Sequence, residues 1–151
     1  MLTAMHHTSL TVSDLERSVT FYTDLGLEVL LRQTPGGTYL QKITGFPHAH
    51  IKQAHLSLPG GGHRLELFEY VSPKGKPVHS RNCDPGNTHL AFVVDNLDGM
   101  YTRLKDRGVE FVSPPVIVDA GANVGMKALY LRDPDGFTIE LFEPKKNPGE
   151  A

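Results

Sequence analysis

The chain has a single cysteine, Cys83, and no tryptophan among its 151 residues. One cysteine excludes an intramolecular disulfide. Asp84 directly follows that cysteine and disfavours a reactive thiolate, so we do not expect a cysteine nucleophile. The N-terminus also lacks the apolar core of a signal peptide, and the expected location is therefore the cytoplasm.

The sequence also lacks an excess of charge of one sign and a long apolar run. Lysine and arginine number 15 and aspartate and glutamate 17, for a formal net charge of −2. Without a basic block, binding to nucleic acid or to a membrane surface has no electrostatic support. No stretch approaches the roughly 20 apolar residues that span a bilayer. The expected partner is a small-molecule substrate rather than nucleic acid or a membrane.

What the chain does contain is a long internal repeat. Residues 7–28 recur as residues 89–110 at a constant offset (89 − 7 = 82) and without a gap. Residues 65–69 recur as residues 139–143 at a second offset (139 − 65 = 74). A similarity held this long at a fixed spacing indicates a duplicated structural unit.

Each copy predicts one strand, one helix and three further strands. The expected fold class is α+β, as a single domain over residues 1–151. It would hold two βαβββ modules, at residues 5–70 and 88–143, joined by a linker at 71–87 that is rich in proline, glycine, lysine and serine. Residues 38–52, which carry the extra length of the first module, predict a strand followed by a loop.

The helix boundaries follow from capping chemistry. Ser13 has N-cap chemistry, with Glu16 three residues later as in a capping box, and Asp95 is the predicted N-cap of the second helix. Gly26 and Gly108 are predicted to end the two helices at the C′ position.

Two histidines and two glutamates are predicted to share one cleft. Successive residues of a strand point to opposite faces, and the apolar residues of these strands are expected to meet the helices. His7, Glu66, His89 and Glu140 then lie on the opposite faces, which two curled sheets can enclose. Each module contributes one histidine from its first strand and one glutamate from its last.

This residue set favours a divalent metal ion. Two carboxylates in a partly dry cleft repel each other, and a cation relieves the cost. Imidazole and carboxylate suit Zn, Ni, Co, Mn or Fe. Four protein ligands in a six-coordinate arrangement leave two positions open for substrate oxygens, which is typical of a catalytic site.

A lone strand histidine is more often a core residue than a ligand, so the symmetric placement of all four residues carries this prediction. His6 has no counterpart in the second copy and is expected to be an ordinary polar residue. His55 is a candidate acid or base that acts in the cleft without binding the metal, weighed against a structural role. Glu69 and Glu143 repeat but lie on the face opposite the cleft, and both are expected to be solvated.

The motif from His7 to Gly26, with residues 86–95 and 133–141, resembles the vicinal oxygen chelate superfamily. This superfamily includes glyoxalase I, methylmalonyl-CoA epimerase, extradiol dioxygenases, and fosfomycin and bleomycin resistance proteins. The resemblance implies a half-open eight-stranded barrel around a metal cleft, and usually a homodimer. It covers nearly the whole chain and is weak for substrate.

By its metal ligands the chain is most similar to glyoxalase I, whose His, Glu, His and Glu match His7, Glu66, His89 and Glu140. The implied reaction is that of a lyase or isomerase, which moves a proton through a metal-chelated enediolate of an α-hydroxycarbonyl-like substrate. Glu66 or Glu140, loosened from the metal, would be the general base.

Three residues with which glyoxalase I binds glutathione are replaced in this sequence. Thr11, Tyr70 and Pro85 stand where the family has an arginine, an asparagine and an arginine. Glutathione specificity is therefore not expected, and the sequence identifies no substrate-binding residue.

Two alternatives remain open. An Fe(II) extradiol-type dioxygenase would use His7, His89 and Glu140 without Glu66. A non-catalytic drug-binding protein would hold no metal at all. In glyoxalase-like homodimers the ligands of one site can also come from two chains, so either one chain or two can complete the site.

Overall fold

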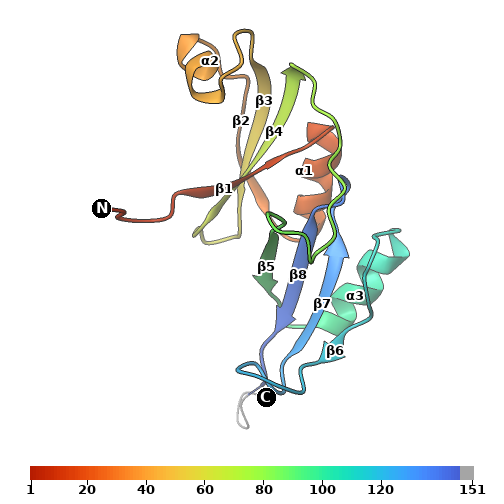
Figure 1. The fold of residues 1–151 in the computed structure, drawn as a ribbon. Coiled ribbons are helices and arrows are strands. Elements are labelled where there is room, and N and C mark those ends of the chain that lie inside the picture. Colours follow the sequence, from red (N-terminus) through yellow and green to blue (C-terminus); the bar gives the residue numbers. More distant parts are fainter. Residues whose placement is uncertain (147–151) are drawn as a thin grey trace. The chain divides into compact units, whose positions relative to one another are not determined.

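The same strand order occurs twice in the structure, a computed structural model that describes residues 1–146. The first sheet has the order β1-β4-β3-β2, and the second has the order β5-β8-β7-β6 (Figure 1). In each sheet the first strand runs parallel to the last, and the remaining pairs are antiparallel. The strands are β1 (His7–Thr11), β2 (Glu28–Gln33), β3 (His50–Ser57), β4 (Arg64–Ser72), β5 (His89–Val93), β6 (Val116–Ile117), β7 (Lys127–Arg132) and β8 (Thr138–Glu143).

The predicted α+β class and the repeated order of strands are thus confirmed. The chain divides into two compact units, which we call the first unit (residues 1–78) and the second unit (residues 79–151). The boundary between them falls inside the predicted linker at 71–87.

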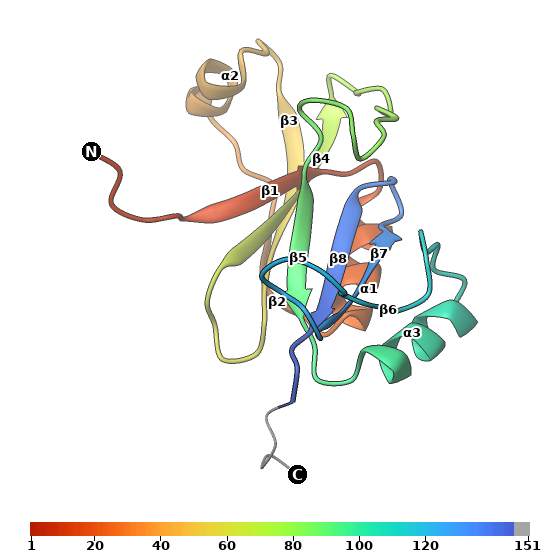
Figure 2. The same cartoon turned by 60° about the horizontal axis from the view of Figure 1, so that its bottom comes forward.

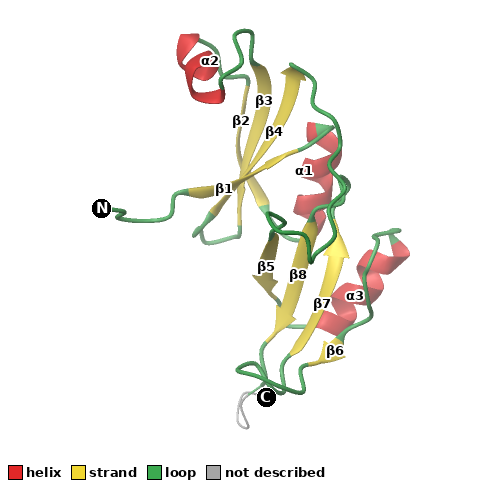
Figure 3. Ribbon diagram, viewed as in Figure 1, coloured by secondary structure: helices red, strands yellow, loops and turns green. Residues whose placement is uncertain are grey.

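One amphipathic helix covers a face of each sheet. Helix α1 (Leu15–Asp24) packs against β2, β3 and β4, and α3 (Leu97–Asp106) packs against β8 (Figure 3). Alternate residues of the last strands are buried on this side, among them Leu65 and Leu67 in β4 and Leu141 in β8. Within residues 1–146, no helix has the length and apolar character required to span a bilayer.

The helices end where the sequence predicts, but each begins one residue later than expected. Gly26 and Gly108 follow α1 and α3 with φ of 110° and 79°, a conformation that glycine adopts at little cost. The N-caps are Asp14 and Asn96, not Ser13 and Asp95. Their side chains accept from the backbone N–H groups three residues on, at 3.0 and 2.9 Å. Both N-caps obey the repeat offset (96 − 14 = 82).

The prediction that Glu69 and Glu143 are solvated was wrong. The backbone N–H of Leu15 donates to Glu69 Oε2 at 3.1 Å, and that of Leu97 donates to Glu143 Oε2 at 2.7 Å. Both glutamates lie on the helix-facing side of the last strand, directly below the first turn of a helix. The carboxylate therefore satisfies a free N–H and meets the positive end of the helix dipole.

The stretch at 38–52 also differs from its prediction, because residues Thr38–Thr44 form a helix, α2. Gly37 and Gly45 flank it, and Gly45 adopts the left-handed conformation with φ of 74°. Figure 2 shows α2 beyond the ends of β2 and β3, apart from α1. Leu40 is its buried residue, while Tyr39 and Ile43 are exposed. β-Branched and aromatic residues favour a strand here, but the two glycines and one apolar contact allow a short helix instead.

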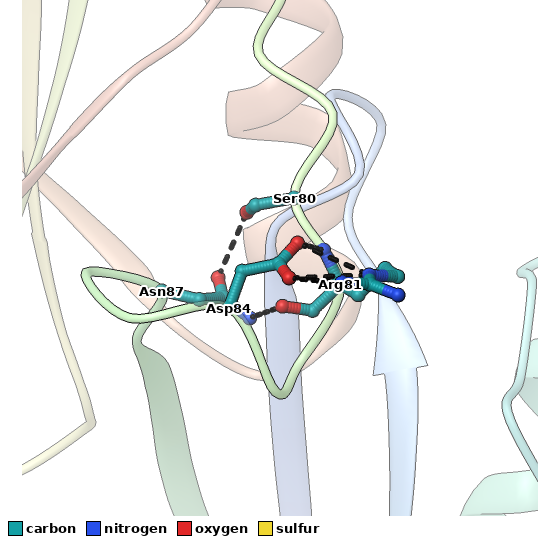
Figure 4. A network of polar contacts seen from close by, with 4 residues as sticks. All are labelled: Ser80, Arg81, Asp84 and Asn87. Carbon is teal, nitrogen blue, oxygen red and sulfur yellow. Dashed lines mark hydrogen bonds and ion pairs between the residues drawn. The ribbon is translucent and has the colours of Figure 1, made fainter.

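Part of the predicted linker is a hydrogen-bonded loop of the second unit (Figure 4). Asp84 accepts from the backbone and the guanidinium of Arg81, at 2.8 and 2.7 Å, and Asn87 accepts from the Ser80 hydroxyl at 3.2 Å. The hydrogen bonds from Arg81 lower the pKa of Asp84 below its usual value. The loop therefore holds an ion pair of Arg81 with Asp84, the residue that follows the exposed Cys83.

Candidate functional site

Three neighbouring strands of the first unit bring His7, His55 and Glu66 together. Glu66 lies on β4, the second strand of the sheet, between β1, which carries His7, and β3, which carries His55. The strand register places Ser9 of β1 and His55 of β3 directly opposite Glu66. Glu66 alternates with the helix-facing Leu65 and Leu67, so its side chain lies on the other face of the sheet.

The Glu66 carboxylate contacts two imidazoles through one oxygen. Glu66 Oε1 lies 3.7 Å from Nδ1 of His7 and 3.6 Å from Nε2 of His55. His6 joins from the N-terminal side, with its Nδ1 2.7 Å from Nδ1 of His7. His6, His7 and Glu66 each offer a ligand atom within 4.8 Å of the other two, an arrangement that can hold a metal ion.

The second unit repeats the histidine–glutamate pair. His89 on β5 places Nε2 3.1 Å from Oε2 of Glu140 on β8. Tyr130 on β7 is opposite Glu140 in the register, and its ring centroid lies 5.5 Å from that of His89. Burial, and then the charge of Glu140, raise the pKa of the Tyr130 phenol. Each predicted histidine thus lies beside the predicted glutamate of its own unit.

The two glutamates differ in their exposure. The Glu66 side chain is 7% exposed and the Glu140 side chain 19%. Among residues 1–146, no lysine or arginine forms an ion pair with Glu66, whose polar neighbours are His7 and His55. Burying a carboxylate this deeply costs free energy unless a cation lies beside it. The burial of Glu66 therefore favours the binding of a positive ion at this carboxylate.

The spacing within each unit fits ligands of one ion. Two atoms at about 2.0–2.2 Å from a shared zinc, at angles from about 90° to 120°, are about 2.8–3.8 Å apart. The separations of Glu66 from His7 (3.7 Å) and of Glu140 from His89 (3.1 Å) both lie in this range. Neutral imidazole and carboxylate are also the donors that zinc and its neighbours in the first transition row accept. The residues present therefore fit a divalent metal.

Three polar residues near these pairs were not identified from the sequence. His6 was set aside because the repeat does not extend to it, yet it contacts His7. No sequence motif marks Gln53 or Tyr130 as a site residue. Their positions near the histidine–glutamate pairs follow only from the pairing of β3 with β4 and of β7 with β8.

Comparison with known proteins identifies the family. Residues 4–141 match the Glyoxalase/Bleomycin resistance protein/Dioxygenase superfamily. The match covers most of the chain, and the protein therefore belongs to this superfamily, as the vicinal oxygen chelate motifs predicted.

Two curated relatives are enzymes by name. The chain is 33% identical over 143 residues to a 2-epi-5-epi-valiolone epimerase from Actinomyces sp, covering 91% of this chain and 78% of the relative. It is 31% identical over 142 residues to a lactoylglutathione lyase from Salmonella typhimurium, covering 92% and 91%. The superfamily membership is thus shared by relatives with different reactions.

The fold is also that of solved members. A glyoxalase family protein from Bacillus cereus superimposes with a TM-score of 0.86 at 25% identity, and the match covers 97% of both chains. This similarity supports the arrangement of two four-stranded mixed sheets with few helices.

Proposed function

We propose that this protein is a divalent-metal-dependent lyase or isomerase of the glyoxalase I type, acting on a small α-hydroxycarbonyl compound. His7, Glu66, His89 and Glu140 are the proposed ligands. One observation carries the proposal: equivalent positions of both units each hold an imidazole–carboxylate pair at a spacing suited to a metal. The buried Glu66, which has imidazoles but no lysine or arginine of residues 1–146 paired with it, adds to this support.

Each residue type has a distinct task in this proposal. The histidines supply neutral nitrogen ligands, and the glutamates offset the charge of the ion. The bound ion would act as a Lewis acid toward two neighbouring substrate oxygens. Glu66 or Glu140 accepts a proton from the carbon beside the carbonyl and returns it to that carbon or its neighbour. A half-open eight-stranded barrel around a metal cleft, in a homodimer, is the proposed setting.

The relatives support proton transfer more strongly than a particular substrate. One is named a lyase and the other an epimerase, a type of enzyme that inverts a single stereocentre. The absence of the family's glutathione-binding residues at Thr11, Tyr70 and Pro85 argues against a glutathione adduct. We therefore favour a hydroxyketone, including a cyclic one, over a thioester-forming substrate.

The test measures hydrogen exchange in deuterated water. Protein stripped of metal with a chelator is reloaded with Zn²⁺, Ni²⁺, Co²⁺, Mn²⁺ or Fe²⁺. It is then incubated with a panel of cyclic and linear α-hydroxyketones, and with the methylglyoxal–glutathione adduct. We expect deuterium to enter the carbon next to the carbonyl with Ni²⁺ or Co²⁺ present, and to stop entering after chelation.

The same samples separate the alternatives. Oxygen consumption with catechols under strict iron dependence would replace the proposal with a dioxygenase. Failure to bind any of these ions would leave a non-catalytic binding protein and would refute the metal site.

A further inference from the structure

Three donor groups of the first unit meet at one point, and only two of them belong to the repeat. The ligand atoms of His6, His7 and Glu66 all lie within 4.8 Å of one another. His7 and Glu66 have counterparts in the second unit, whereas the position that corresponds to His6 (88 − 6 = 82) holds Thr88. The imidazole of His6 is therefore an addition that the repeat does not require.

His6 and His7 are adjacent in the sequence but turn the same ring atom toward each other. Consecutive residues of a strand point to opposite faces, but β1 begins at His7, so His6 lies outside the strand and does not follow this rule. The two Nδ1 atoms are 2.7 Å apart, and the ring planes meet at 82°. His6 thus approaches the same nitrogen that His7 places 3.7 Å from Glu66 Oε1.

These separations are close to those of ligands on one ion. Two ligands of a shared zinc lie about 2.8–3.8 Å apart, a range that includes the 3.7 Å between His7 and Glu66. The 2.7 Å between the two rings is just below it, because without an ion one Nδ1 donates a hydrogen bond to the other. Both histidines are exposed, so each ring can carry its proton on Nε2 instead. The two rings need to separate only slightly to accept an ion in place of the shared proton.

The burial of the three groups also suits a cation that enters from water. The Glu66 side chain is 7% exposed, and among residues 1–146 no lysine or arginine forms an ion pair with it. His6 and His7 are both exposed. The carboxylate therefore attracts a cation from below, while the two imidazoles face the solvent. Two neutral imidazoles and one carboxylate are a donor set that zinc, cobalt, nickel and iron accept.

We propose that His6 is a metal ligand, and that the first unit binds a divalent transition-metal ion through His6, His7 and Glu66 even without the ligands of the second unit. The inference rests on the proposed function for the roles of His7 and Glu66 and adds a ligand to that site. With His89 and Glu140, five protein groups would surround the ion. The glutamate that serves as general base is loosened from the ion in that proposal, which leaves two positions for substrate oxygens.

The first experiment removes the ligands of the second unit. The full-length variant His89→Ala/Glu140→Gln is titrated with Zn²⁺ and Co²⁺ in competition with a chromophoric chelator, with and without His6→Ala. We expect this double variant to bind one ion per chain, and His6→Ala to weaken that binding by at least about 10–100-fold, since even a residue that only orients a ligand contributes this much. A double variant that binds neither ion would overturn the independent site of the first unit.

The matched control is His50→Ala, which removes an exposed histidine at the start of β3. In the same background it should leave the affinity for both ions unchanged. Circular dichroism of each variant without added metal verifies its fold.

The second experiment counts imidazoles by X-ray absorption at the bound zinc. The wild type should show three, from His6, His7 and His89, and His6→Ala should show two. The wild-type count does not depend on the folding of any variant. Two imidazoles in the wild type would contradict ligation by His6.

The outcomes separate the inference from the proposed function. Equal affinity and an equal imidazole count with and without His6 would refute the inference and leave the proposed function intact. Wild-type affinity in His89→Ala/Glu140→Gln that is lost with His6→Ala would support the inference and refute the four-ligand site of the proposed function. Failure of the wild type to bind either ion would refute both.

Discussion

The two units share a scaffold but differ around their glutamates. Strand order, the register of the first strand on the last, and the anchoring of the helix by a glutamate are the same in both. Glu66 is nearly buried and contacts two imidazoles, whereas Glu140 is more exposed and lies beside one imidazole and a tyrosine. The features that hold each sheet and helix together are thus shared, whereas the surroundings of the two histidine–glutamate pairs differ in the neighbouring strand.

The largest expected effect concerns the glutamates themselves. Glu66→Gln and Glu140→Gln each remove one carboxylate charge from the proposed site and leave the size of the side chain nearly unchanged. We expect each to lower kcat/KM for deuterium exchange by about 10²–10⁴-fold, the range for loss of a general base. Glu28→Gln, at an exposed position, is the control. Full activity of Glu140→Gln would refute its assignment.

The next comparison concerns the glutamates that anchor the helices. Glu69→Ala and Glu143→Ala each free a backbone N–H at a helix start and remove a charge from the positive end of the helix dipole. We expect each to lower the free energy of unfolding by about 1–2 kcal/mol, measured by urea denaturation. Glu28→Ala and Glu110→Ala, two exposed glutamates also related by the repeat, should change it by less than about 0.5 kcal/mol. Equal effects in all four variants would contradict the anchoring role.

A smaller effect is expected at the N-caps. Asp14→Ala and Asn96→Ala should each cost about 1 kcal/mol in unfolding free energy, because each side chain accepts one N–H at the first turn. Added salt should reduce the loss at Asp14 alone, since only this cap carries a charge. Asp95→Ala is the control, and a loss there as large as at Asn96 would restore the cap predicted from the sequence.

Much of the fold followed from the repeat and from period-two alternation. These two patterns place Leu65 and Leu67 under the helix and Glu66 on the opposite face, and the structure agrees. Gly26 and Gly108 marked the helix ends because few other residues adopt their backbone conformation.

The rest depends on contacts between strands and helices that the sequence does not display. The role of Glu69 and Glu143 requires knowing that a helix start lies over the end of the last strand. The contact of His55 with Glu66 requires the β3–β4 register, which the glycine-rich turn between them does not specify. Helix α2 has a weak apolar pattern, and its composition alone favours a strand.

The central proposal is that His7, Glu66, His89 and Glu140 bind one divalent ion, whether these ligands come from one chain or from two chains of a homodimer. The most direct test is the stoichiometry and affinity of Zn²⁺ binding to wild type, His7→Ala and His89→Ala. The claim predicts one ion per wild-type chain and a loss of affinity of at least about 100-fold in either variant. Two ions per chain, or wild-type affinity in either variant, would contradict it.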